Sequence, residues 1–167
     1  MNRARKTTYA ITLISGLLLT VAHNANALPD DKEQPINVSA DNAIKNSNKG
    51  LTVYQGNVFI TQGSIRITGD KVAIYDDAGI ISKMIATGNP AEFRQQPETE
   101  SSETIANGST IEYDITKEVL LLTENAKLEQ GGDLTTSNKI TYDIKSTVIN
   151  AGDKNGRVIM TLQPATQ

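Results

Sequence analysis

Side chains that could catalyse a reaction or hold a metal ion are few in this chain of 167 residues. It has no cysteine, and its one histidine, His23, lies in an N-terminal segment that we expect to be removed. Without these residues the remaining chain has no Ser-His-Asp or Cys-His nucleophile and lacks the ligands of nearly all zinc sites. The sequence therefore predicts no catalytic residue, no metal site and no cofactor. Only a carboxylate-pair hydrolase stays formally possible.

Carboxylates gather in two places. Asp76 and Asp77 are adjacent, but the spaced oxygen ligands of a calcium loop do not follow them. Three glutamates stand between residues 98 and 103, inside the most polar stretch of the chain, 95–104. We interpret the aspartates as a solvated turn and the glutamates as part of a solubilising loop.

The segment from Met1 to Ala27 has the pattern of a secretory signal peptide. A basic start is followed by an apolar run over 9–22 and by Ala25-Asn26-Ala27, a small-x-small cleavage site. The alternative is a membrane anchor, but a run of about 14 residues falls short of the ~20 that span a bilayer. We predict export, with cleavage near Ala27, and a polar, flexible lead-in over 28–34.

The charge of the remaining chain limits its partners. The whole chain has 16 basic and 19 acidic residues, and the signal segment holds three of the basic ones. After cleavage, 13 basic residues face 19 acidic ones, a net charge of −6. This acidity gives no electrostatic reason to bind nucleic acid. The length suits one domain, which we place at 35–163, with a short tail at 164–167.

The chain is organised around the stretch from Gly56 to Asp76, where apolar and polar residues alternate. Breaks at Gly63 and at Gly69-Asp70 divide it, so the pattern predicts three half-buried antiparallel strands. Part of this sequence recurs in the second half of the chain without an insertion or deletion. Asn57, Gln62, Gly63 and Lys71 match Asn125, Gln130, Gly131 and Lys139. All four pairs have the same offset, and a fixed offset indicates an internal repeat.

Similar short runs fill the rest of the chain and indicate an all-β fold with a dozen or more strands. A four-fold pattern appears at the bends that precede short apolar runs, namely Asp41, Asp70, Ser109 and Asn138. Each repeated unit cannot bury its apolar face alone, so neighbouring units must stack.

The alternation leaves one large apolar face, which fills either a closed core or a groove between two incompletely closed layers. The candidate lining of the groove is Ile36, Val38, Val58, Ile60, Ile67, Ile74, Phe93, Tyr113, Ile115, Leu122 and Tyr142. The same face includes Ile65, Val72, Ile111, Leu120, Leu128, Ile140 and Leu162.

The first and last strands have no sequence-adjacent partner on one side, so we expect exposed sheet edges there. The interface that this predicts comprises Ile36, Asn37, Val38, Ser39, Val158, Ile159, Met160, Thr161 and Leu162. Such edges can pair with another chain, either a copy or a related sheet, and a head-to-tail contact of this kind builds filaments.

Three segments carry a resemblance to a known family: QPINVSADNA at 34–43, YQGNVFITQGSIRITGDKVAIYD at 54–76 and LTENAKLEQGGDLTTSNKITYD at 122–143. They resemble the OstA-like (LptA) family of periplasmic lipopolysaccharide transport proteins. The resemblance implies an elongated, open β-jelly roll of about 16 antiparallel strands built from short-strand units. One departure is Glu124, which stands where the family has the glycine of a Gly-Asn turn.

The function that the resemblance implies is non-enzymatic transport of lipopolysaccharide through the periplasm, from the inner to the outer membrane, within a bridge. Acyl chains of lipid A would contact Ile36, Val38, Phe93, Tyr113 and Ile115. The N-terminal edge would meet LptC, and the C-terminal edge would meet LptD or further copies of the chain. The cargo follows from the resemblance alone.

Two alternatives stay open from the residues themselves. A β-repeat scaffold with a filled core would assemble by edge pairing and carry no lipid. An exported glycan hydrolase would use Asp and Glu, and is the least supported of the three.

Overall fold

The computed structural model describes residues 31–96, 102–154 and 156–164. The predicted signal peptide, residues 28–30 of the lead-in, 97–101 of the acidic loop and 165–167 of the tail lie outside the described residues. No helix in the described part is long and apolar enough to cross a membrane.

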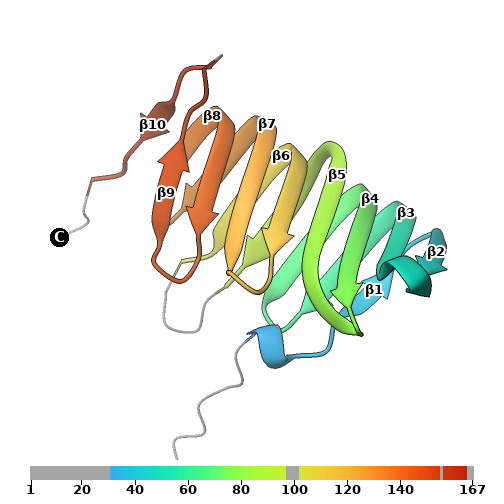
Figure 1. The fold of residues 1–167 in the computed structure, drawn as a ribbon. Coiled ribbons are helices and arrows are strands. Elements are labelled where there is room, and N and C mark those ends of the chain that lie inside the picture. The colour runs from blue at the N-terminus through green and yellow to red at the C-terminus, as the bar shows by residue number, and fades with distance from the viewer. Residues whose placement is uncertain (1–30, 97–101, 155, 165–167) are drawn as a thin grey trace, which may run out of the picture.

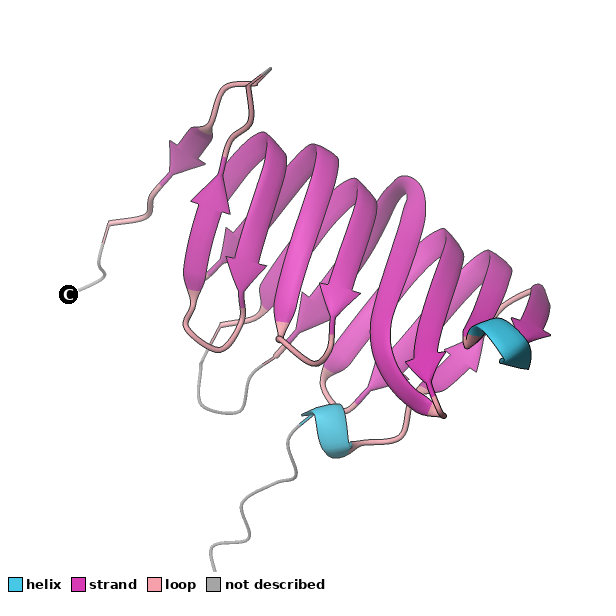
Figure 2. Cartoon of the chain, viewed as in Figure 1, coloured by secondary structure: helices cyan, strands magenta, loops and turns pink. Residues whose placement is uncertain are grey.

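Ten antiparallel strands make one sheet in the described part of the chain, and the sheet is open (Figure 1). The strands are β1 (Asn37–Ser39), β2 (Asn42–Asn46), β3 (Leu51–Gln62), β4 (Ile65–Asp77), β5 (Ile80–Gln95), β6 (Thr104–Asp114), β7 (Val119–Gln130), β8 (Asp133–Asp143), β9 (Val148–Ala151) and β10 (Ile159–Thr161). Two short 3-10 helices, η1 (Asp31–Glu33) and η2 (Ser47–Lys49), complete the described elements (Figure 2).

The sheet runs in the order β1-β3-β4-β5-β6-β7-β8-β10, so the long strands follow one another as in the sequence. At one end, β1 pairs with the second half of β3 and β2 with its first half. At the other end, β10 pairs with the first half of β8 and β9 with its second half. Each end of the sheet therefore presents two short strands.

Every long strand bends near its middle, and the pairing register shifts there, for example between Gln55 and Val58 in β3. Positive backbone φ angles mark several of these bends: 80° at Gly56, 47° at Asn57, 61° at Glu124 and 57° at Asn125. Because the bends lie side by side, the sheet folds over into two layers along one line (Figure 1).

We call the layers the first wall and the second wall. The first wall comprises residues 37–39, 58–69, 91–96, 102–108, 126–137 and 159–161. The second wall comprises residues 42–55, 71–87, 110–123 and 139–151. On each wall the alternating apolar side chains face the other wall, and cross-strand pairs such as Ile60 with Ile67 and Ile67 with Phe93 line them up in rows. Burial of these rows is what holds the walls together.

The predicted count of about 16 strands is not confirmed. The bends that the sequence suggests as strand ends lie inside continuous strands, so the second and third strands expected in 56–76 are one strand, β4. If the six long strands are divided at their bends, their halves and the four short strands give 16 segments. The expected turn at Gly63 does end a strand.

The lead-in predicted to be flexible is structured in its described part. Residues 31–33 form η1, and the Gln34 backbone N–H donates to the Asp31 carbonyl oxygen at 3.0 Å. Polar composition suggested flexibility, but the partners of this segment are distant in sequence, as described below.

Substitution of Gly56 by alanine tests the bend. A Cβ atom there would overlap Asp41 Oδ2, whereas one at Gly79, with a similar φ of 88°, meets nothing within 4 Å. Gly79→Ala should therefore cost about 1–2 kcal/mol, the strain of a left-handed residue alone. Gly56→Ala should cost at least ~1 kcal/mol more, because Asp41 must also move. Urea unfolding measures both, and equal losses would contradict this account of the bend.

Candidate functional site

The interior between the walls is formed by one cluster of buried apolar side chains in the described part of the chain. Its buried members in the described part include no charged side chain, and the only polar ones are Gln62, Thr104, Thr135 and Ser137. An apolar interior without a buried charge can hold hydrocarbon. Among the described residues, no three His, Cys, Asp or Glu side chains come together in a group that could hold a metal ion.

Nine of the eleven residues predicted to line a groove are buried in this interior, namely Val58, Ile60, Ile67, Ile74, Phe93, Tyr113, Ile115, Leu122 and Tyr142. Ile36 and Val38 are partly buried and pack against the same cluster. The structure therefore brings all eleven together between the walls. It does not bring Leu162 there. That residue is 66% exposed, because it follows β10, an edge strand whose own three residues are all exposed.

The middle of the interior is closed by contacts between the walls. Phe93 on the first wall and Tyr113 on the second meet edge to face, with ring centroids 5.5 Å apart. Gln130 Nε2 on the first wall donates to Tyr142 Oη on the second at 2.8 Å and to Thr104 Oγ1 at 3.1 Å. Phe93 is fully buried. The interior is thus packed as a core along its middle.

Cavities lie toward the ends of this core. At the N-terminal end, a cavity of about 230 Å³ is bordered by Ile36, Val38, Tyr54, Ile74 and Ile81, with polar residues at its rim. A second, of about 360 Å³, lies between the walls under residues 32–36 and is described further below.

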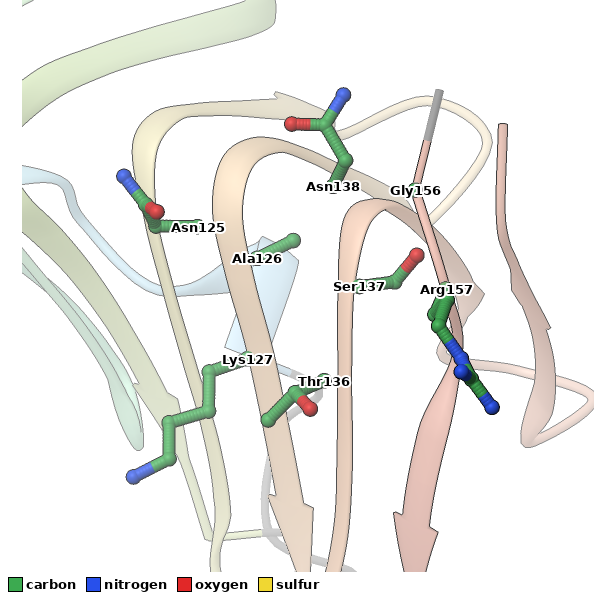
Figure 3. A pocket seen from close by; sticks show the side chains of 8 residues that line it. All are labelled: Asn125, Ala126, Lys127, Thr136, Ser137, Asn138, Gly156 and Arg157. Atoms are coloured by element: carbon green, nitrogen blue, oxygen red, sulfur yellow. The ribbon is translucent and has the colours of Figure 1, made fainter. Parts of the chain in front are cut away.

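The C-terminal cavity has a volume of about 370 Å³ and lies beside the bends of β7 and β8, under the segment at Gly156 and Arg157 (Figure 3). Ala126 and Ser137 reach it from the interior, and Ser137 Oγ is buried without a protein partner. In Figure 3 the charged ends of Lys127 and Arg157 point away from each other, so they do not form one charged site.

The exposed edges are at the ends of the sheet, where the sequence places them. β1 contains the predicted Asn37, Val38 and Ser39, and Ile36 precedes it. β10 contains Ile159, Met160 and Thr161, and Val158 and Leu162 flank it. The sequence analysis missed that β2 and β9 are also edges, since only the fold at the bends splits each end into two strands.

Two further groups of residues were missed. Met84, Ala86, Ala91, Ala106 and Ala126 are buried in the interior. The alternation in 80–86 could have identified the first two. Alanines give a weak apolar signal, so the other three could be found only from their pairing, as when Ala106 lies opposite Phe93 and Leu128.

Charged groups lie on the outside of the walls. The Arg94 guanidinium lies 2.7 Å from Glu92 Oε1 and 3.2 Å from Glu103 Oε2. The hydrogen bond from Arg94 lowers the pKa of the Glu92 carboxyl; partial burial opposes this, and Asn107 lowers it further. These charged contacts of Arg94 lie on the outer face of the first wall, where they add little stability, and they are not part of the interior.

These features define the class of protein: an open β-jelly roll with an apolar interior and unpaired strand edges at both ends. Comparison with known proteins gives the family. The chain belongs to the family described as "LptA/(LptD N-terminal domain) LPS transport protein", which matches residues 37–148.

Relatives of known name agree. The lipopolysaccharide export system protein LptH of Pseudomonas aeruginosa is 37% identical over 156 residues, 92% of this chain and 89% of that protein. The lipopolysaccharide export system protein LptA of Escherichia coli K12 is 31% identical, over 92% of this chain and 84% of that protein. These relatives are named as export proteins, not as enzymes.

A solved structure has the same fold. The crystal structure of LptH, described as the LptA homologous periplasmic component of the lipopolysaccharide transport device from Pseudomonas aeruginosa, superposes with a TM-score of 0.76. It shares 35% sequence identity and covers 81% of this chain and 100% of that one.

Truncation of two lining residues tests whether the interior is core or open groove. Phe93→Ala should lower the free energy of unfolding by about 3–5 kcal/mol, because it empties a packed site. Val38→Ala should cost below ~1.5 kcal/mol, because Val38 lies at the partly exposed end and loses less buried surface. Urea unfolding of the purified protein measures both. A loss at Phe93 as small as that at Val38 would mean that the middle is open too.

Proposed function

We propose that this protein is a non-enzymatic carrier of lipopolysaccharide, which holds the acyl chains between its walls and works as one part of a bridge from the inner to the outer membrane. The observation that carries the proposal is the uncharged apolar interior, which extends from β1 to β9 in a member of a lipopolysaccharide transport family. The lining is the eleven-residue set from Ile36 to Tyr142 given above.

The physical basis is the hydrophobic effect. Each CH₂ group of an acyl chain that leaves water gains about 0.8 kcal/mol. Charged lipid head groups would stay outside, because the buried set of the described residues has no charge to receive them. No energy source is needed inside the protein if cargo moves from one apolar surface to the next.

The bridge would form through the sheet edges. The N-terminal edge, β1 with β2, would pair with LptC, and the C-terminal edge, β9 with β10, with LptD or another copy. The family includes the N-terminal domain of LptD as well as LptA, which supports pairing between related sheets. Exposed Ile159 and Met160 are apolar side chains that such pairing would cover.

The periplasm is the compartment that fits. The solved relative is described as a periplasmic component, and the signal peptide pattern, with cleavage near Ala27, would deliver the chain there.

One observation favours the scaffold as the second candidate function. The middle of the interior is packed, with Phe93 fully buried and its ring against that of Tyr113. A protein with a permanently filled core would assemble by its edges and carry nothing.

Photocrosslinking separates the two. A photoreactive residue in place of Val38 or Phe93 should attach to lipopolysaccharide in cells that contain the transport partners, because both side chains face the interior. Lys127 is the matched control on the same wall, since it is exposed. Attachment at neither inward position in folded protein would exclude the carrier and leave the scaffold.

A charge at the last strand tests the bridge. Ile159→Asp should raise the concentration needed for end-to-end assembly at least tenfold, because a carboxylate would be desolvated in the paired edge. Static light scattering over a concentration series measures this. Ile80→Asp is the control: Ile80 is comparably exposed, 75% against 63%, but lies at a hairpin away from both ends. Equal effects of the two substitutions would rule out β10 as the assembling edge.

A further inference from the structure

Residues 31–36 cross the open side of the molecule, where the hairpin ends of the two walls face each other. We call this segment the strap. It comprises η1 and the extended residues that lead into β1, and Figures 1 and 2 show η1 beside the hairpin ends and away from the line of bends.

The strap is fastened to the first wall by Asp31. Its carboxylate accepts hydrogen bonds from Ser64 Oγ at 2.7 Å and from Gln95 Nε2 at 2.8 Å, and also from the Ser64 backbone N–H. Ser64 lies in the turn between β3 and β4, and Gln95 ends β5. The contacts thus join neighbouring hairpin ends of the same wall.

Gln62 holds the middle of the strap. Its Nε2 donates to the carbonyl oxygens of Lys32 at 3.1 Å and Gln34 at 3.2 Å. Gln62 is only 3% exposed, and its Oε1 has no protein partner. A buried acceptor left without a donor is costly, and so it marks a place where another group can bind.

The repeat gives an internal comparison. Gln130 is the counterpart of Gln62 at the fixed offset of the repeat. Its amide bonds Tyr142 Oη on the second wall, which joins the walls directly. In the N-terminal half the strap stands between the walls instead.

The strap reaches the second wall through a polar contact as well. Lys32 Nζ lies 3.3 Å from Glu118 Oε1, in the turn between β6 and β7. Beneath lies the cavity of about 360 Å³, lined on the second wall by Ile80, Ile81 and Ile115. The cavity therefore has isoleucine side chains of the second wall on one side and, on the other, a segment that polar contacts hold.

This arrangement makes the strap displaceable. An intramolecular hydrogen bond contributes little net stability because it replaces a bond to water, and holding the strap residues in place costs conformational entropy of similar size. Ile36 is the one large apolar side chain of the strap, so release of the strap exposes little apolar surface of its own.

We propose that the strap is a removable cover over a lateral opening between the walls. A lipid acyl chain enters by taking the place of Ile36 beside Ile81 and Ile115. The Gln62 Nε2 atom then donates to hydrogen-bond acceptors at the head-group end of the acyl chain instead of to the carbonyl oxygens of the strap. The inference rests on the proposed carrier function, which it deepens by naming the route of loading.

A disulfide that fastens the strap tests this route. The chain has no cysteine of its own, so the double variant Asp31→Cys, Ser64→Cys can form only one intramolecular disulfide. The two side chains that it replaces are hydrogen-bonded to each other. Loading is followed as the rate at which lipopolysaccharide crosslinks to a photoreactive residue at position 93. The oxidised protein should load at least tenfold more slowly than wild type, and reduction should restore or exceed the wild-type rate.

Each outcome decides something. If the oxidised protein loads as fast as wild type, cargo enters at the ends and the strap proposal is wrong, while the carrier function stands. If wild type itself never crosslinks, the carrier function fails. If the reduced variant loads more slowly than wild type, loosening the strap does not help loading, which also overturns the proposal.

A single substitution gives an independent test without a crosslink. Gln62→Leu removes both hydrogen bonds to the strap and should speed loading several-fold. Gln130→Leu is the matched control for loss of a glutamine amide, because the Gln130 amide is partly buried and bonds Thr104 and Tyr142, not the strap. Equal effects of the two variants on the loading rate would count against a role for the strap.

Discussion

All the long strands must bend at one level, because each is paired with its neighbours on both sides of the bend. A strand that bent elsewhere would lose its partners, so the position of the bend is imposed on the whole sheet. Because the sheet folds along this line of bends, the apolar faces of the two walls face each other and form the interior. At the two ends of the sheet, side-chain hydrogen bonds hold the bends of the outermost long strands. Asn57 Nδ2 donates to Asp41 Oδ2 at 2.9 Å, and Asn138 Nδ2 donates to Asp153.

The sequence predicts much of this pattern, because alternation and turn residues are local signals. Ile60, Phe93 and Leu122 face inward as expected, and three of the four predicted bend residues, Asp70, Ser109 and Asn138, lie where the long strands bend. What the sequence could not distinguish was a bend from a strand end, since a Gly-Asn pair suits both. Glu124 shows the limit most clearly: it has a φ of 61° at a bend where composition gives no such signal, and only pairing with the neighbouring strands imposes it.

For the candidate site, too, the sequence predicts the local features and not the contacts between distant residues. Alternation shows which side chains face inward, but not whether they meet others across the space. That depends on the sizes of residues on opposite walls, such as Phe93 and Tyr113, which come from different strands. The strap was missed for a related reason. Its polar residues look flexible in isolation, and their partners Gln62, Ser64 and Gln95 come much later in the chain.

A packed interior and a carrier function are physically compatible. When an acyl chain enters, apolar contacts between the walls are replaced by apolar contacts with the lipid, so the transfer free energy nearly cancels inside the protein. The resistance to opening then comes mainly from polar contacts that join the walls. In the C-terminal half these include the direct bond from Gln130 to Tyr142. In the N-terminal half Gln62 is bonded to the strap. The walls should therefore separate first beneath the strap, because a segment can leave there without breaking the sheet.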